Sequence, residues 1–228
     1  MLELIDSPTE RTTAATDALL ALLCLGCVLY LRRFRAQDAW KVRIWSAAFA
    51  LLGAAALLGA LAHGLVLAAA VQPWLWGPLY LCLGLAVALF GTGAVHDAAG
   101  GRASRRALPI LAAIALAFVA LTRVAGGGFL LFVLYEAVVM LLALGAYAWL
   151  AATGRLPGAA WMAGGILLTL SAAALQATRV VPRLELIWTF DHNGLFHLVQ
   201  MPALVLLALG LGAALRRQPE GAATARSA

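Results

Sequence analysis

Four ionisable side chains lie inside long apolar segments, where a charge is costly unless it meets a partner or water. They are Asp17, His63, Glu136 and His197. Two imidazoles and a carboxylate are donors that suit zinc, which keeps an open position for water at catalytic sites. Metal-bound water ionises near neutral pH and can attack an ester or amide. These residue types predict a zinc site with His63 and His197 as ligands and with Glu136 and Asp17 as catalytic carboxylates.

Further polar residues share the segment that holds His197. Asn193, His197 and Gln200 are spaced i, i+4, i+7, which places them on one face of a helix. We expect Asn193 and Gln200 to contact a ligand or to orient the metal ligands. His192, at the mouth of the same segment, is interpreted either as a peripheral ligand or as an exposed loop histidine.

The elements that position these residues are predicted to be membrane-spanning helices. Of the 228 residues, 64% are apolar and 11% are charged, against about 25% charged in soluble domains. The sequence predicts an all-α integral membrane protein, a seven-helix transmembrane bundle over residues 1–217, with a disordered cytoplasmic tail over 218–228. Each apolar run is long enough to cross a bilayer, and the runs are 12–31, 44–70, 74–95, 107–123, 128–151, 158–178 and 193–214.

Lysine and arginine predict the direction of the chain. Of the sixteen such residues, twelve fall at one set of segment ends. Because basic residues collect on the cytoplasmic side, the N-terminus is expected outside and the C-terminus in the cytoplasm. The net charge of +6 is therefore assigned to topology, and nucleic acid is not expected as a partner. In this direction all four buried ionisable groups fall in the outer half of the bilayer.

Smaller signals concern the helix ends. Ser7 to Glu10 resembles a capping box, and Asp191 is placed to cap the last helix. Gly59 and Gly64 flank His63 and are expected to leave room around its ring. His96 and Asp97 are expected to be solvated at the cytoplasmic end of the third span. All seven tryptophans fall near predicted span ends, as in interfacial belts.

The pattern resembles a known superfamily. A histidine late in the second span and a histidine motif opening the seventh are similar to the membrane hydrolases that include alkaline ceramidases and progestin/adiponectin-type receptors. The resemblance implies zinc held by His63 and His197. Asn193 stands where that superfamily has the first histidine of its His-x-x-x-His pair, and Gly59 stands where it has a serine. Residues 192–200 also look like the HNxxxHxxQ signature of uncharacterised bacterial seven-span proteins, which implies a bacterial-type cytoplasmic (inner) membrane.

Two classes of function follow. The first is a zinc-dependent hydrolase of a lipid or other amphipathic amide or ester, with Glu136 or Asp17 as the third ligand and membrane lipids around it. The second is a non-catalytic protein that binds a ligand or acts as a sensor, in which the polar groups only hold the bundle together. Paired histidines also leave haem ligation open, and Asp17 alone has the further interpretation of a side chain that snorkels to the surface.

Overall fold

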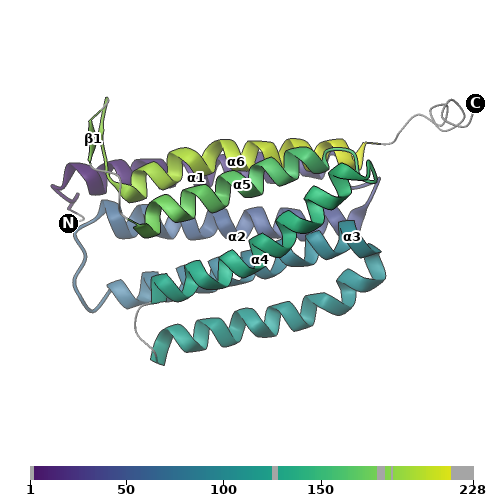
Figure 1. Ribbon diagram of the computed structural model, residues 1–228. Coiled ribbons are helices and arrows are strands. Elements are labelled where there is room, and N and C mark those ends of the chain that lie inside the picture. Colours follow the sequence, from purple (N-terminus) through teal and green to yellow (C-terminus); the bar gives the residue numbers. More distant parts are fainter. Residues whose placement is uncertain (1–2, 125–127, 179–182, 186, 217–228) are drawn as a thin grey trace, which may run out of the picture.

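The computed structural model describes residues 3–124, 128–178, 183–185 and 187–216 (Figure 1). Within these ranges, six helices are long and apolar enough to cross a membrane, so the chain is an all-helical, multi-pass membrane protein. The predicted tail over 218–228 lies outside the described residues. The helices are α1 (Pro8–Arg32), α2 (Ala39–Gly64), α3 (Gln72–Val124), α4 (Gly128–Ala152), α5 (Ala159–Thr178) and α6 (His192–Leu215).

Helix α3 is a helical hairpin. Its 53 residues would extend to about 80 Å as one straight helix, far beyond the ~30 Å of a hydrocarbon core. It breaks at Gly100, whose φ of 86° lies in the region that glycine adopts at no steric cost. A Cβ on Gly84 would lie 3.1 Å from Phe118, and one on Gly91 would lie 3.3 Å from Leu111. The arms 72–99 and 101–124 therefore run antiparallel, as Figure 1 shows.

Side-chain caps fix where several helices begin. Ser7 accepts a hydrogen bond from the backbone N–H of Glu10, and Asp191 accepts from two N–H groups at the start of α6, so both residues are confirmed as N-caps. The carboxylate of Glu10, which a capping box would turn back to Ser7, lies against His63 instead. Helix α2 begins earlier than its apolar run because Asp38 caps it. It also ends earlier, at Gly64, and the apolar residues that follow lie outside the helix.

Two short strands precede α6 and were not predicted. β1 (Leu184–Glu185) and β2 (Thr189–Phe190) pair antiparallel. Strand β2 contacts both α1 and α6. The pair therefore brings the start of α6 against α1.

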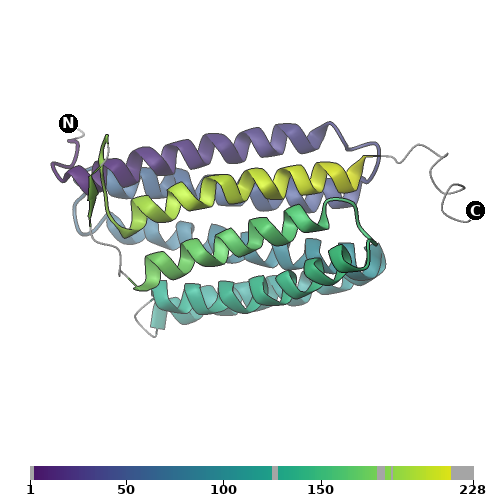
Figure 2. The same cartoon turned by 45° about the horizontal axis from the view of Figure 1, so that its top comes forward.

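The helices pack in a ring in which α1 contacts α2 and α6, and α5 contacts α4 and α6. Figure 2 shows α1, α6 and α5 side by side. Small residues allow the closest approach, since a Cβ on Gly165 would lie 2.9 Å from the carbonyl oxygen of Ala203. Such contacts are typical of helices that associate in lipid.

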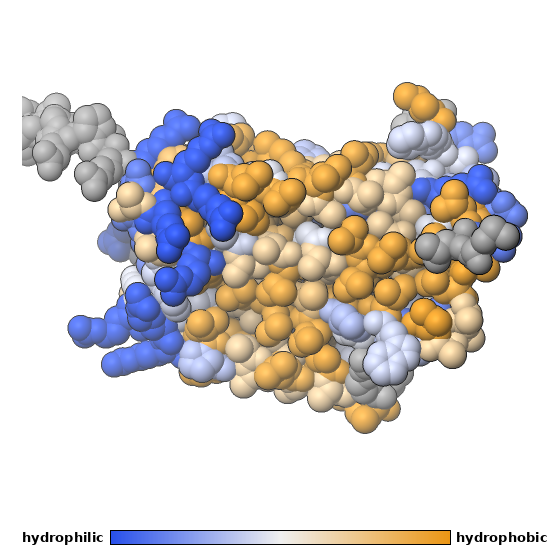
Figure 3. Space-filling view, turned by 180° about the vertical axis from the view of Figure 1, so that it is seen from behind, coloured by the Kyte–Doolittle hydropathy of each residue, from blue (hydrophilic) through white to orange (hydrophobic). Residues whose placement is uncertain are grey.

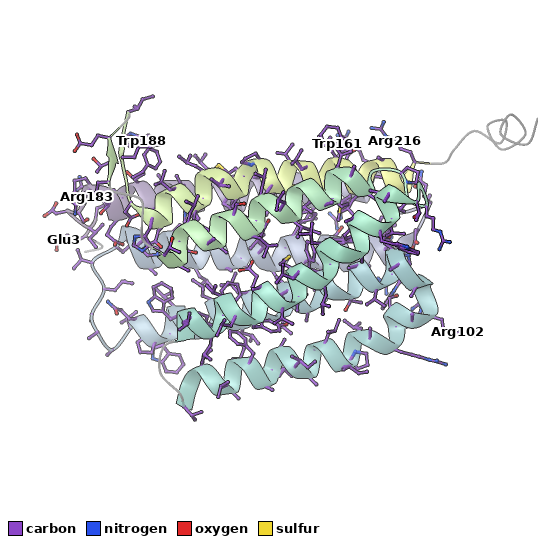
Figure 4. All side chains as sticks on the ribbon, viewed as in Figure 1. Glu3, Arg102, Trp161, Arg183, Trp188 and Arg216 are labelled. Atoms are coloured by element: carbon purple, nitrogen blue, oxygen red, sulfur yellow. The ribbon has the colours of Figure 1, made fainter. Side chains whose placement is uncertain are left out.

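The surface divides into an apolar belt and two polar ends (Figure 3). Figure 4 places Arg102, Trp161 and Arg216 at the end where the chain finishes, and Arg183 and Trp188 at the end where it starts. We call these the C-terminal end and the N-terminal end of the bundle. Arg102 and Arg216, which were assigned to one side from the sequence, thus lie at the opposite end from Arg183, which was assigned to the other.

Candidate functional site

A cavity of about 350 Å³ lies inside the bundle, bounded by α1, α2, the first arm of α3, α4, α5 and α6. Most of its wall is apolar. The structure brings all the site residues proposed from the sequence to this one cavity, and they are Asp17, His63, Glu136, His192, Asn193, His197 and Gln200.

His197 is held between two side chains of α1. Its Nδ1 lies 2.8 Å from the Thr16 hydroxyl, and its Nε2 lies 3.2 Å from Oδ1 of Asp17. The Thr16 hydroxyl also donates to carbonyl oxygens of its own helix, 2.9 and 3.0 Å away, and it has only one proton to give. With that proton on a carbonyl, Nδ1–H donates to Thr16, and one further proton lies between His197 and Asp17. The pair is then neutral overall, as burial in a membrane favours.

Gly59 makes room for this pair. A Cβ at Gly59 would lie 2.7 Å from Oδ2 of Asp17. From the sequence, Gly59 was interpreted as making room for the ring of His63, one turn further along α2. That interpretation is wrong, because the carboxylate that fills the space comes from α1.

His63 also has a partner on α1. Its Nδ1 lies 2.7 Å from Oε2 of Glu10, and its ring packs edge-on against Trp76 at 5.7 Å between centroids. Glu10, Thr13 and Asp17 are spaced i, i+3, i+7, which places them on one face of the first helix. Each of them reaches a polar partner outside α1, since Thr13 donates to Asp191.

The remaining polar residues of α6 connect it to α5. Asn193 accepts a hydrogen bond of 3.0 Å from Gln176, and Gln200 donates one of 3.2 Å to Thr169. Neither α5 residue was identified from the sequence. Thr169 and Gln176 could have been found as polar side chains in an apolar helix, because their seven-residue spacing places them on one face.

Two carbonyl-bearing groups in the wall are buried and unpaired. Gln200 is 5% exposed, and its Oε1 has no hydrogen-bond partner within the described residues. Glu136 is 9% exposed, and its carboxyl group makes no hydrogen bond or ion pair to any other described residue. Phe132, Glu136 and Met140 line the cavity together, as their four-residue spacing along α4 requires.

His192 is part of α6 and not of a loop. It is the first residue of the helix, half-buried, and its Nδ1 lies 4.0 Å from Oδ2 of Asp191. The expectation of an exposed loop histidine is therefore wrong. Its place in the cavity wall leaves the interpretation as a peripheral ligand residue.

The arrangement does not fit a zinc ion. Among the described residues, no three His, Cys, Asp or Glu side chains are placed to share a metal, whereas a zinc site needs at least three protein ligands. Both ring nitrogens of His197 contact side chains of α1, and His63 pairs with a different carboxylate. Axial ligation of a haem would also need a free ring nitrogen on His197, so the same contacts argue against it.

A second polar cluster lies near the C-terminal end of the bundle. Lys41 forms an ion pair with Asp97, and the two side chains are 4% and 2% exposed. The hydroxyl of Tyr147 donates to the second oxygen of Asp97 at 2.7 Å. Asp97 was expected to be solvated, and this is wrong, because the first arm of α3 continues past its apolar run and carries the residue into the bundle. His96 is partly buried and lies 2.9 Å from Asp38.

Trp45 is likewise inside the bundle and not in an interfacial belt. It is 1% exposed, packs edge-on against Phe90 at 4.8 Å between centroids, and lines the cavity. Its indole N–H has no partner within the described residues. Nothing in the sequence indicates that a tryptophan near a predicted span end points into the bundle.

Comparisons with known proteins give a family but no activity. No curated protein and no solved structure matches the chain. A family model matches residues 12–216, which include every helix described above except the first residues of α1. The chain therefore belongs to DUF6962, a family of unknown function.

Proposed function

We propose that this chain is a seven-span protein of a bacterial-type cytoplasmic membrane that binds a small amphipathic molecule inside the bundle. The two arms of α3 count as separate spans, which raises six long helices to seven crossings. An odd number places the termini on opposite sides, and the positive-inside rule assigns the C-terminal end to the cytoplasm. The cavity polar residues then lie in the outer half of the bilayer.

One observation carries the binding function: Glu136 lines the cavity and has no hydrogen-bond or ion-pair partner among the described residues, and the Oε1 of Gln200, another residue of the wall, is buried and unpaired. Leaving a buried hydrogen-bonding group unpaired costs about 1–3 kcal/mol. A cluster that only held the helices together would pair Glu136 with a neighbouring helix, as it does His197, and would use both amide atoms of Gln200, whereas only the nitrogen is used. A ligand in the cavity would supply the missing partners.

The wall also supports an amphipathic ligand. His63, His192 and Asn193 lie toward the N-terminal end of the cavity, while Trp45 and Phe90 line it toward the other end. A molecule lying along the bundle would place its polar group near the histidines and its apolar part near the aromatic rings. The cavity volume suits a small molecule, since ligand pockets hold about 300–1,000 Å³.

Zinc-dependent hydrolysis, expected from the residue types, has weaker support. Neither nitrogen of His197 is free to bind a metal or to act as a general base while Thr16 and Asp17 hold it. Metal analysis tests this directly. Stoichiometric zinc in the purified protein, lost in His197→Ala but kept in His96→Ala, would restore the hydrolase hypothesis over simple binding.

Filling the cavity tests the binding function. Ala56 is buried in the cavity wall, whereas Ala54 is exposed on the same helix, so Ala54→Phe is a matched control for Ala56→Phe. Protein extracted with its native lipids is analysed by mass spectrometry for small molecules that co-purify. We expect a molecule enriched with the wild type and the control and depleted with Ala56→Phe. Equal retention by all three proteins would contradict the proposal.

A further inference from the structure

The charge of the cavity wall restricts its ligand. Its ionisable side chains are two carboxylic acids, three histidines and the phenol of Tyr80, and none of the described residues that line it is a lysine or arginine. Arg102, Arg183 and Arg216 lie at the ends of the bundle (Figure 4), and Lys41 is already paired with Asp97. An anionic head group would therefore meet carboxyl groups without a fixed positive charge to balance it.

Glu136 is the group that such a wall leaves unbalanced. The residue is 9% exposed, and its carboxyl group contacts no cation among the described residues, whereas Asp17 has His197 and Glu10 has His63. A buried carboxylate requires a counter-charge or hydrogen-bond donors. None of the described residues brings either one to Glu136, and a ligand in the cavity can supply both.

Gln200, on α6, is a second residue of the wall with an unpaired acceptor. Its amide nitrogen donates to Thr169, so only its oxygen is unpaired. The wall residues without a complete set of partners therefore include two acceptor groups, and a ligand that donates several hydrogen bonds can satisfy the carboxyl group of Glu136. An ammonium has three donors and no acceptor. The indole N–H of Trp45, in contrast, is an unpaired donor and suits a ligand with an acceptor group. The test below therefore compares an amine with an alcohol and a carboxylate.

Aromatic rings in the cavity wall also favour a cationic ligand. Trp76 and Tyr80 line the cavity with ring centroids 6.2 Å apart. Cations are attracted to the faces of such rings at distances up to about 6 Å. Phe196 and Phe90 line other parts of the same wall.

We infer that the ligand is a hydrophobic amine, whose ammonium group binds Glu136 and whose apolar part lies along the aromatic wall. This inference rests on the proposed binding function and specifies its ligand. The amine is charged at neutral pH, as lysine is. Its charge and that of Glu136 cancel inside the bundle, so the bound state carries no net charge from this pair.

Three ligands with the same chain and different head groups test the inference. Titration calorimetry uses the full protein in phosphatidylcholine nanodiscs with n-decylamine, n-decanol and decanoate, and empty nanodiscs correct for partitioning into lipid. We expect decylamine to bind at least about tenfold more tightly than decanol, and decanoate to show no binding above the lipid background. This head-group comparison needs no variant, so it is independent of any folding defect.

Glu136→Gln then tests the counter-ion, with Glu185→Gln as the matched control. Glu185 is exposed and outside the cavity. We expect Glu136→Gln to lower decylamine affinity about tenfold while leaving decanol unchanged, and the control to change neither. Decanol or decanoate binding as tightly as decylamine, or no loss in Glu136→Gln, would overturn the amine inference while leaving the binding function in place. Failure of all three molecules to bind, with no difference between wild type and Ala56→Phe, would overturn both.

Discussion

Removing only one partner of the buried ion pair between Lys41 and Asp97 is expected to destabilise the protein. In Lys41→Met, Asp97 keeps its hydrogen bond from Tyr147 but loses its counter-charge at a position that is 2% exposed. Removing one partner of a buried pair typically destabilises a protein by about 3–5 kcal/mol, because an uncompensated charge remains. We expect a loss of this size in the free energy of unfolding.

The double variant Lys41→Met/Asp97→Asn should recover most of that loss. The carboxamide introduced by Asp97→Asn still offers an oxygen to Tyr147, and no charge is left in the pair. Replacing a buried pair with uncharged residues is often neutral or stabilising, so we expect the double variant to lie within about 2 kcal/mol of the wild type. Recovery would show that the cost comes from the unpaired charge and not from lost packing.

Equilibrium unfolding in mixed micelles, with rising mole fraction of sodium dodecyl sulfate, measures both variants. The chain offers a matched control, since Arg11 pairs with Asp6 at the surface, where the side chains are 54% and 99% exposed. Exposed pairs contribute little, so Arg11→Met should change stability slightly or not at all. An effect of Lys41→Met no larger than that of Arg11→Met, or a double variant no more stable than the single one, would refute the reasoning.

Further predictions concern glycines and topology. Gly59→Ala should lower thermal stability, by about 1–3 kcal/mol, because its Cβ would lie 2.7 Å from Asp17; Gly26→Ala, with nothing within 4 Å, should leave it unchanged or slightly raised, and equal melting temperatures would argue against the contact. Gly100→Ala should destabilise the α3 hairpin by about 1–3 kcal/mol, because a side chain is strained at a φ of 86°; an unchanged melting temperature would contradict this. A reporter fused after Ala228 should be active only in the cytoplasm, and activity outside would reverse the orientation.

The helices could be predicted from the sequence because hydropathy is a property of each segment alone. Every apolar run corresponds to a helix or to an arm of α3, and the glycine at the break is the residue that a reversal at φ 86° requires. The helix ends were less accurate where a cap decides them. Asp38 starts α2 five residues before its apolar run, since capping satisfies backbone N–H groups irrespective of hydropathy.

The cavity residues could be identified because polar side chains are rare in lipid, but their partners could not. His197 pairs with residues of α1 that are about 180 positions away in the chain. Which faces of two helices meet depends on their rotation and tilt, which packing sets and hydropathy does not encode. For the same reason Lys41 and Asp97, 56 residues apart, were not recognised as a pair.

Helix α1 determines what His63 and His197 can do. The resemblance to zinc hydrolases depends on two histidines, His63 late in the second predicted span and His197 near the start of the last. In this chain each imidazole lies against a carboxylate of α1, Glu10 for His63 and Asp17 for His197. A carboxylate that bonds to the second ring nitrogen of a metal-bound histidine orients that histidine. In His197, however, Asp17 contacts Nε2 and Thr16 contacts Nδ1, so no nitrogen remains for a metal.

The same contacts explain why Glu136 stands apart. With His63 and His197 committed to α1, Glu136 on α4 is the carboxylic acid of the described wall that has no partner among the described residues. If α1 released His197, an imidazole would become available to Glu136 and the need for a cationic ligand would disappear. Asp17→Ala tests this dependence on α1: because it loosens His197 from α1, it should weaken decylamine binding although Asp17 itself does not bind the ammonium. Unchanged affinity in this variant would contradict the role of α1 in keeping His197 away from Glu136.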